Sequence, residues 1–190
     1  MAGLRPRSVA VPGLDAAWSA CPYEGLGREL VIALKFGGRL ALADRVAGAI
    51  AKLAPREHVR GVVIPVPAAP ARRRWRGFDV AEEISAALGA RTGLEVRRCL
   101  RRGEGRRQVG RPRAERIADP PRVRLCAPAP RSAVLVDDVL TTGATLRACA
   151  EALRAGGAGR VVALAFAASA REGAAHAQAR SRLGGQRSAA

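Results

Sequence analysis

The stretch Val134-Leu-Val-Asp-Asp-Val-Leu-Thr-Thr-Gly-Ala-Thr145 decides how this chain of 190 residues is interpreted. It opens with an apolar run that is too short for a helix and is typical of a buried strand. Two adjacent acids, Asp137 and Asp138, end that strand, and a buried carboxylate pair is costly unless cations or hydroxyl groups satisfy it. The stretch then leads directly into a helix, which the sequence predicts from about Ala144 to Ala155.

This helix start predicts a phosphate site. Free amides and the positive end of the helix dipole attract anions, and Gly143 lets the backbone approach a ligand closely. The candidate phosphate-binding residues are Thr141, Thr142, Gly143, Ala144 and Thr145. A ligand with a phosphate at one end and vicinal hydroxyls at the other, such as a ribose 5-phosphate, fits both the loop and the acid pair. The simpler alternative is that Thr141 is an ordinary helix N-cap and that the two acids are turn residues near the end of a strand. A Walker A loop is excluded, because no GxxxxGK[ST] occurs.

The elements around this stretch predict an α/β fold with a parallel sheet flanked by helices. Helices are expected at about 26–34 (ending near Gly37-Gly38), 40–53 and 79–90, and strands at 61–66, 95–100, 134–136 and 161–166. Segments 67–77 and 101–116 are expected to be loops. We expect residues 1–170 to form one domain and 171–190 a flexible tail. Ligands of such sheets bind beyond the carboxyl ends of the strands, here after Val66 and Val136.

Charge and cysteine content narrow the function further. Lys and Arg number 33 against 16 acids, a formal charge of +17 that favours nucleic acid or polyphosphate as a partner, although a GC-rich genome would also favour Arg. Eleven Arg lie between Arg97 and Arg124.

The four cysteines are far apart, which argues against a zinc site and indicates that they are small buried side chains. No apolar run is long enough to span a membrane and no secretory signal is visible, so we expect a cytoplasmic protein.

The stretch from 134 to 145 closely resembles the phosphoribosyl-pyrophosphate (PRPP) motif of type I phosphoribosyltransferases. More of the chain resembles one branch of them, the ComF (competence protein F) family. The resemblance includes Tyr23-Glu-Gly-Leu26 with Leu34-Lys-Phe-Gly37, Ile64-Pro-Val-Pro67 with Arg76-Gly-Phe-Asp79, and Gln108 with Glu115-Arg116 and Asp119. The chain departs from the family in lacking a four-Cys N-terminal zinc finger, with only Cys21 in that region. Asp79 and Asp119 stand where Asn is usual.

The resemblance implies a type I phosphoribosyltransferase-like fold and a role for each candidate residue. Asp137 and Asp138 would bind the ribose hydroxyls, and Thr141–Thr145 the 5-phosphate. The leaving pyrophosphate would be held by residues near the strand end and by basic side chains: Val66, Pro67, Ala68, Arg72, Arg73, Arg76 and Lys35. The Arg-rich segment 101–116, with Gln108 and Arg116, resembles a mobile hood. Mg²⁺ would bind through PRPP, and the sequence suggests no metal site of the protein itself.

Three functions remain open at this stage. The first is transfer of ribose 5-phosphate from PRPP to a small nucleophilic acceptor with release of pyrophosphate. The second is a non-enzymatic basic accessory of DNA uptake that contacts single-stranded nucleic acid, and the third is a PRPP sensor without turnover. Trp75 and Phe78 flank the Arg cluster, where they either anchor the loop or stack on a base.

Overall fold

In the part of the chain that the structure describes, five strands form the central sheet, in the order β1-β2-β7-β6-β3. Their bounds are Arg7–Val9 (β1), Ala16–Pro22 (β2), Val62–Pro65 (β3), Ser132–Leu140 (β6) and Arg160–Ala168 (β7). Only β1 runs antiparallel to its neighbour, and the other pairs are parallel. A separate antiparallel pair joins β4 (Leu100–Arg102) to β5 (Val123–Leu125). The computed structural model describes residues 4–36, 41–103 and 121–169.

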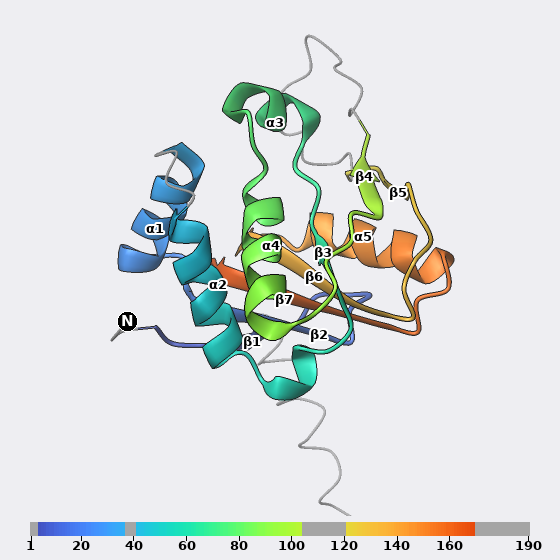
Figure 1. Ribbon diagram of the computed structural model, residues 1–190, viewed down its shortest axis with the longest axis horizontal. Coiled ribbons are helices and arrows are strands. Elements are labelled where there is room, and N and C mark those ends of the chain that lie inside the picture. Colours follow the sequence, from blue (N-terminus) through green and yellow to red (C-terminus); the bar gives the residue numbers. More distant parts are fainter. Residues whose placement is uncertain (1–3, 37–40, 104–120, 170–190) are drawn as a thin grey trace, which may run out of the picture.

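Helices cover both faces of the sheet, which gives three layers (Figure 1). The helices are α1 (Gly25–Phe36), α2 (Ala41–Leu53), the 3-10 helix η1 (Arg56–His58), α3 (Pro70–Arg76), α4 (Val80–Thr92) and α5 (Ala144–Ala155). Buried side chains of α1, α2 and α4 pack on one face, and those of α5 pack on the other. The mostly parallel α/β sheet flanked by helices that the sequence predicted is therefore confirmed.

The alternation of side chains along β6 explains why it needs apolar residues on both sides. Val134 and Val136 pack with the α1, α2 and α4 layer, whereas Ala133 and Leu135 pack with α5. All four are fully buried, as expected for a central parallel strand. Such a strand is held rigidly, so the acids at its carboxyl end occupy fixed positions.

Several sequence predictions need correction. Segment 67–77 is not only a loop, because α3 forms within it: Pro70 fits the first helical turn, and Gly77 ends the helix with φ of 77°. The predicted strand at 95–100 is reduced to a single bridge between Val63 and Val96, with β4 starting at Leu100. The strand predicted at 134–136 extends to 132–140, so the acid pair lies inside it.

Strands β1, β2 and β5 were not predicted at all. The sequence of β2, AAWSACP, has few β-branched residues, yet its interior positions are buried beside β7. The cysteines were expected to be buried, and this holds for Cys21, Cys99 and Cys149, whereas Cys126 is exposed. Burial raises the pKa of the Cys21 thiol to about 11, so this thiol stays protonated at neutral pH. Among the described residues, no helix is both long enough and apolar enough to cross a membrane.

Candidate functional site

A cavity of about 210 Å³ opens where β3 and β6 end. It is lined by residues of five segments: Tyr23, Lys35, Val66, Pro67, Ala68, Ala69, Arg72, Arg76, Asp79, Val80, Ala81, Arg102, Asp137, Asp138, Val139, Thr141 and Thr145. This is the strand edge at which the sequence placed a ligand. Acidic and basic side chains share the cavity, so its chemistry is set by how their charges are arranged.

The two acids meet different surroundings. The Oδ2 atom of Asp138 lies 2.6 Å from Nζ of Lys35, at the end of α1. Asp137 accepts a hydrogen bond of 2.8 Å from the backbone N–H of Asp138. Its negative charge acts to raise the pKa of Cys149 in α5 and the pKa of Arg102 in β4. One carboxylate therefore already has a cationic partner, whereas the other is satisfied mainly by a backbone amide.

Burial raises the pKa of Asp137 well above its usual value, and the neighbouring Asp138 raises it further. Lys35 acts in the opposite direction but more weakly. In the free protein, ionised Asp137 is thus disfavoured, and a ligand that brings hydroxyl donors or a cation to it would relieve this cost. A diol or a ligand-bound metal ion supplies such groups.

Four cationic side chains line the cavity: Lys35, Arg72, Arg76 and Arg102. Burial lowers the pKa of Arg102, and the nearby charge of Arg72 lowers it further. Two guanidinium groups that repel each other across a cavity are stabilised by an anion between them. Because guanidinium pairs with phosphate oxygens through two parallel hydrogen bonds, this side of the cavity suits a phosphate or pyrophosphate group.

Two polar atoms in the cavity lack a hydrogen-bond partner. These are Nε of Arg76 and Oδ2 of Asp138, whose ion pair with Lys35 does not have hydrogen-bond geometry. A buried donor without a partner costs roughly 1–3 kcal/mol. Both residues line the cavity, although these two atoms are themselves buried.

A smaller cavity of about 40 Å³ lies at the start of α5, lined by Asp137, Val139 and residues 140–146. Gly143 forms the helix N-cap with φ of 64°, in the left-handed region that favours glycine. The first amides of α5 have no acceptor within the helix, as at any helix start. Asp137 and Thr141 line both cavities, so the phosphate loop and the acid pair are adjacent.

Asp79 links the loop after β3 to α4. One of its carboxylate oxygens accepts from the N–H of Ala68 at 3.0 Å, and the other accepts from Ala81 at 3.1 Å as the N-cap of α4. The side chain is buried. The amide of Ala68 was predicted to hold pyrophosphate, and here an acid of the protein already occupies it.

Removing this link should destabilise the protein. We expect Asp79→Ala to cost about 1–2 kcal/mol, because the cap of α4 is lost and two amides lose their acceptor. Asp79→Asn keeps one carbonyl acceptor and should cost about half as much. Thermal unfolding of the three proteins measures this order. Equal melting temperatures for Asp79→Ala and wild type would show that the link does not stabilise the fold.

Most of the predicted site residues converge on these two cavities. Arg73 does not line them: it is exposed and lies 3.5 Å from Glu82. Gln108 and Arg116 lie outside the described residues. The sequence analysis missed Arg102 and Tyr23 as cavity residues. Tyr23 stood in a quoted motif without a role, and Arg102 was one of many Arg, so no local signal distinguished it.

A family model described as phosphoribosyl transferase domain matches residues 68–181, more than half of the chain. No curated protein matches the sequence. Similar solved structures include an allosteric regulatory enzyme of purine biosynthesis (16% identity, TM-score 0.48, covering 71% of this chain and 30% of that one). Glutamine PRPP amidotransferase from B. subtilis is another (17% identity, TM-score 0.47, 70% and 30% covered).

Orotate phosphoribosyltransferase from Aeropyrum pernix is similar as well, with 22% identity, a TM-score of 0.42, and 76% of this chain and 68% of that one covered. The chain thus spans about 30% of the length of the first two structures, which are larger proteins. The match to the family model begins at Ala68, within the loop after β3, and covers the acid pair and the phosphate loop. This chain belongs to the phosphoribosyl transferase domain family.

Proposed function

We propose that the chain binds PRPP in the larger cavity and transfers its ribose 5-phosphate to a nucleophile, releasing pyrophosphate. The observation that carries this proposal is the set of groups around two adjoining cavities: an anion-binding helix start, two acids and four cations. PRPP has a terminal phosphate, a diol and a pyrophosphate, which these three sets of groups suit. The ComF-like motifs support assignment to that branch of the family.

At one end of the site, Thr141–Thr145 hold the 5-phosphate. The helix dipole alone contributes only about 0.3–1 kcal/mol for an exposed anion, so backbone N–H groups and threonine hydroxyls supply most of the affinity. In the middle, Asp137 and Asp138 accept hydrogen bonds from the ribose hydroxyls. Since Asp138 is already fixed by Lys35 at 2.6 Å, it is held in place before the sugar arrives.

At the other end, Arg72, Arg76, Arg102 and Lys35 neutralise the pyrophosphate. The backbone beyond Pro67 contributes less than the sequence suggests, because the Ala68 N–H donates to Asp79. The basic side chains therefore carry the leaving-group contacts. Guanidinium groups that already line the cavity stabilise the departing charge with little rearrangement during the reaction.

The site residues fit Mg²⁺ only together with a substrate. Among the described residues, no three His, Cys, Asp or Glu side chains gather into a metal site. Asp137 and Asp138 offer oxygen ligands of the kind Mg²⁺ prefers, and substrate hydroxyls and phosphates would complete its coordination. When bound, the ion neutralises charge on the pyrophosphate.

Transfer forms one bond and breaks another at C1 of the ribose. The lone pair of the nucleophile attacks C1, and the electrons of the C1–O bond leave with pyrophosphate. The residues of this chain act by positioning the sugar and stabilising the departing anion, since no histidine lines either cavity. The Asp137 carboxylate lies close to the sugar, where it stabilises developing positive charge.

Calorimetry with the wild-type protein tests this proposal. We expect PRPP to bind in the presence of Mg²⁺ and more weakly after chelation, and ribose 5-phosphate to bind where ribose does not. A screen of nucleobases and amines for pyrophosphate release tests turnover. Binding without release from any acceptor would favour a sensor over a transferase. Absence of PRPP binding would refute the proposal.

A further inference from the structure

Two cysteines lie opposite each other at the end of the β4–β5 pair. The register of these strands pairs Leu100 with Leu125, so one step further along it Cys99 lies opposite Cys126. The backbone N–H of Cys126 donates to the carbonyl oxygen of Cys99 at 2.9 Å, which agrees with this pairing. Opposite residues of this kind have Cα atoms about 5.5 Å apart, and a disulfide spans roughly 4.4–6.8 Å. The backbone therefore places the two cysteines at a distance that a disulfide can bridge.

The two thiols are also close to each other. The Sγ of Cys126 donates a hydrogen bond of 3.6 Å to the carbonyl oxygen of Arg98, the residue that precedes Cys99. Burial raises the pKa of the Cys99 thiol, and the neighbouring Cys126 raises it further. Both side chains are free thiols in the structure. A bond between them requires no change in the register of the strands.

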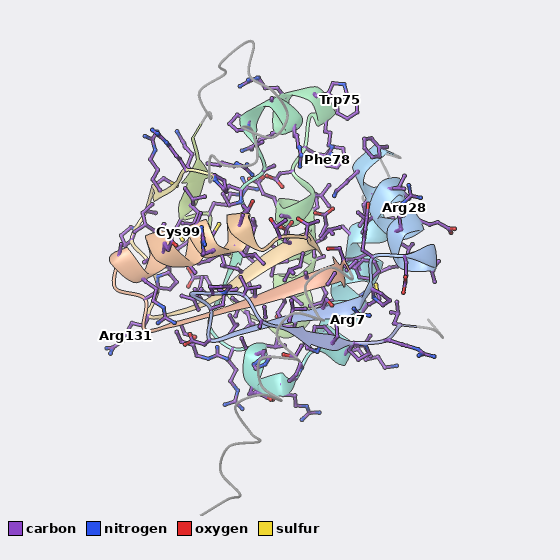
Figure 2. The ribbon with its side chains drawn as sticks, turned by 180° about the vertical axis from the view of Figure 1, so that it is seen from behind. Arg7, Arg28, Trp75, Phe78, Cys99 and Arg131 are labelled. Atoms are coloured by element: carbon purple, nitrogen blue, oxygen red, sulfur yellow. The ribbon has the colours of Figure 1, made fainter. Side chains whose placement is uncertain are left out.

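The two thiols differ in their access to solvent. Cys126 is exposed, whereas Cys21, Cys99 and Cys149 are buried. Cys99 packs in the same core layer as Cys149 of α5, and Figure 2 shows it beside that helix. An oxidant in solution therefore reaches Cys126 first, and Cys99 is the thiol that a modified Cys126 meets next. An exposed thiol beside a second, resolving thiol is the usual arrangement of a redox-sensitive pair.

The β4–β5 pair is a weak element that such a bond would strengthen. Each strand has only three residues, and a pair of strands on its own is marginally stable. Arg101 and Arg124 are exposed and directly opposite each other, and like charges in this position are destabilising. Strand β4 also carries Arg102, which lines the larger cavity. A bond at the end of the pair would therefore hold Arg102 more firmly in place.

We propose that Cys99 and Cys126 are a redox modification site, at which a reversible disulfide ties β4 to β5 and fixes Arg102 at the larger cavity. The oxidant is a small disulfide such as oxidised glutathione. The Cys126 thiolate attacks one of its sulfurs, which forms a mixed disulfide and releases one small thiol. Cys99 then attacks Sγ of Cys126 and releases the second. The two protein thiols lose two electrons and two protons, which leave with the small thiols.

Mass spectrometry of the wild-type protein tests the bond directly. The protein is equilibrated with oxidised glutathione at pH 8 and digested with trypsin without reduction. We expect peptide 99–101 to be joined to peptide 125–131, and the two to separate after treatment with dithiothreitol. The oxidised protein should melt roughly 5–10 °C above the reduced protein, because the bond restricts the unfolded chain between its two ends.

Two variants control this experiment. Cys126→Ser changes an exposed side chain, so it should leave the fold intact but lose both the joined peptides and the rise in melting temperature. Cys21→Ala is the matched control, since it removes a cysteine that packs in the other core layer and bonds to the carbonyl of Phe166. This variant should keep the joined peptides and the rise in melting temperature.

Calorimetry with pyrophosphate tests the effect on the cavity. The oxidised protein should bind pyrophosphate about threefold more tightly than the reduced protein, because less freedom of the Arg102 side chain is lost on binding. Arg102→Ala should remove this difference. Equal affinities of the oxidised and reduced wild type would overturn the effect on Arg102. Absence of pyrophosphate binding in both forms would contradict the proposed function as well, whereas the disulfide itself is judged from the peptides.

Three results would overturn the redox site. The first is glutathione that stays on Cys126 without any joined peptides 99–101 and 125–131. The second is a disulfide-linked dimer through Cys126, which would show that this thiol reacts between chains and not with Cys99. The third is a joined pair of peptides in a protein that melts no higher than the reduced form, since the bond would then not stabilise β4 and β5.

Discussion

We expect the Asp137→Asn variant to unfold at a higher temperature than the wild type at neutral pH while binding PRPP about 10- to 100-fold more weakly. The gain in stability follows from burial, which raises the pKa of Asp137 and makes its ionised form costly in the folded state. The loss of affinity follows from removing a charged hydrogen-bond acceptor, which typically contributes roughly 1.5–3 kcal/mol.

The pH dependence has a definite sign. A carboxyl whose pKa is raised on folding contributes its full stability below about pH 4, where it is protonated in both states. This stability is lost as the pH rises through the folded pKa. The melting temperatures of wild type and Asp137→Asn should therefore coincide near pH 4 and separate toward pH 8. Each unit of pKa shift corresponds to about 1.4 kcal/mol, or roughly 2–6 °C for a chain of this size.

Asp138→Asn is the matched control, since it changes the neighbouring acid in the same way. Asp138 pairs with Lys35 at 2.6 Å, so its replacement leaves a partly buried lysine without its partner. We expect this variant to lose PRPP affinity as well but to gain no stability. Thermal unfolding from pH 4 to 8 and calorimetry with Mg²⁺ and PRPP measure both effects. A stability difference for Asp137→Asn that stays constant over this pH range would contradict the assignment.

The parts of the fold that could be predicted are those whose signal is local. The buried strand around Val134, the helix from Ala144 and the glycine between them are encoded in adjacent residues. The same is true of α4, which begins after its N-cap Asp79 and ends at Gly93. Strand β2 carries no such signal, because its Ala and Ser residues become a strand only through pairing with β7.

The electrostatic partners in the site could not be predicted for a similar reason. Lys35 looked like an ordinary cation at a helix end, and its contact with Asp138 depends on where α1 packs. Arg102 reaches the cavity from β4, a strand that the sequence placed too early in the chain. The bond from Ala68 to Asp79 joins a loop to a helix start, and neither segment alone indicates it.

We expect Gly143→Ala to be the most damaging single-methyl change in the phosphate loop. An added Cβ would lie 2.9 Å from Cγ1 of Val11, and φ of 64° already disfavours any side chain. The left-handed conformation costs about 1–2 kcal/mol for a non-glycine residue. Overpacking against Val11, itself a buried core residue, adds about 1–3 kcal/mol.

Gly93→Ala separates these two contributions. Gly93 has a similar φ of 72°, but nothing lies within 4 Å of its added Cβ, so this variant shows the backbone cost alone. Gly143→Ala should lower the melting temperature by about twice as much and should weaken ribose 5-phosphate binding, which Gly93→Ala leaves unchanged. Adding Val11→Ala to Gly143→Ala removes the clashing methyl groups. If this second change restores phosphate binding, contact with Val11 is what moves the loop; if binding stays weak, the left-handed conformation of Gly143 is itself required to direct the amides at the phosphate.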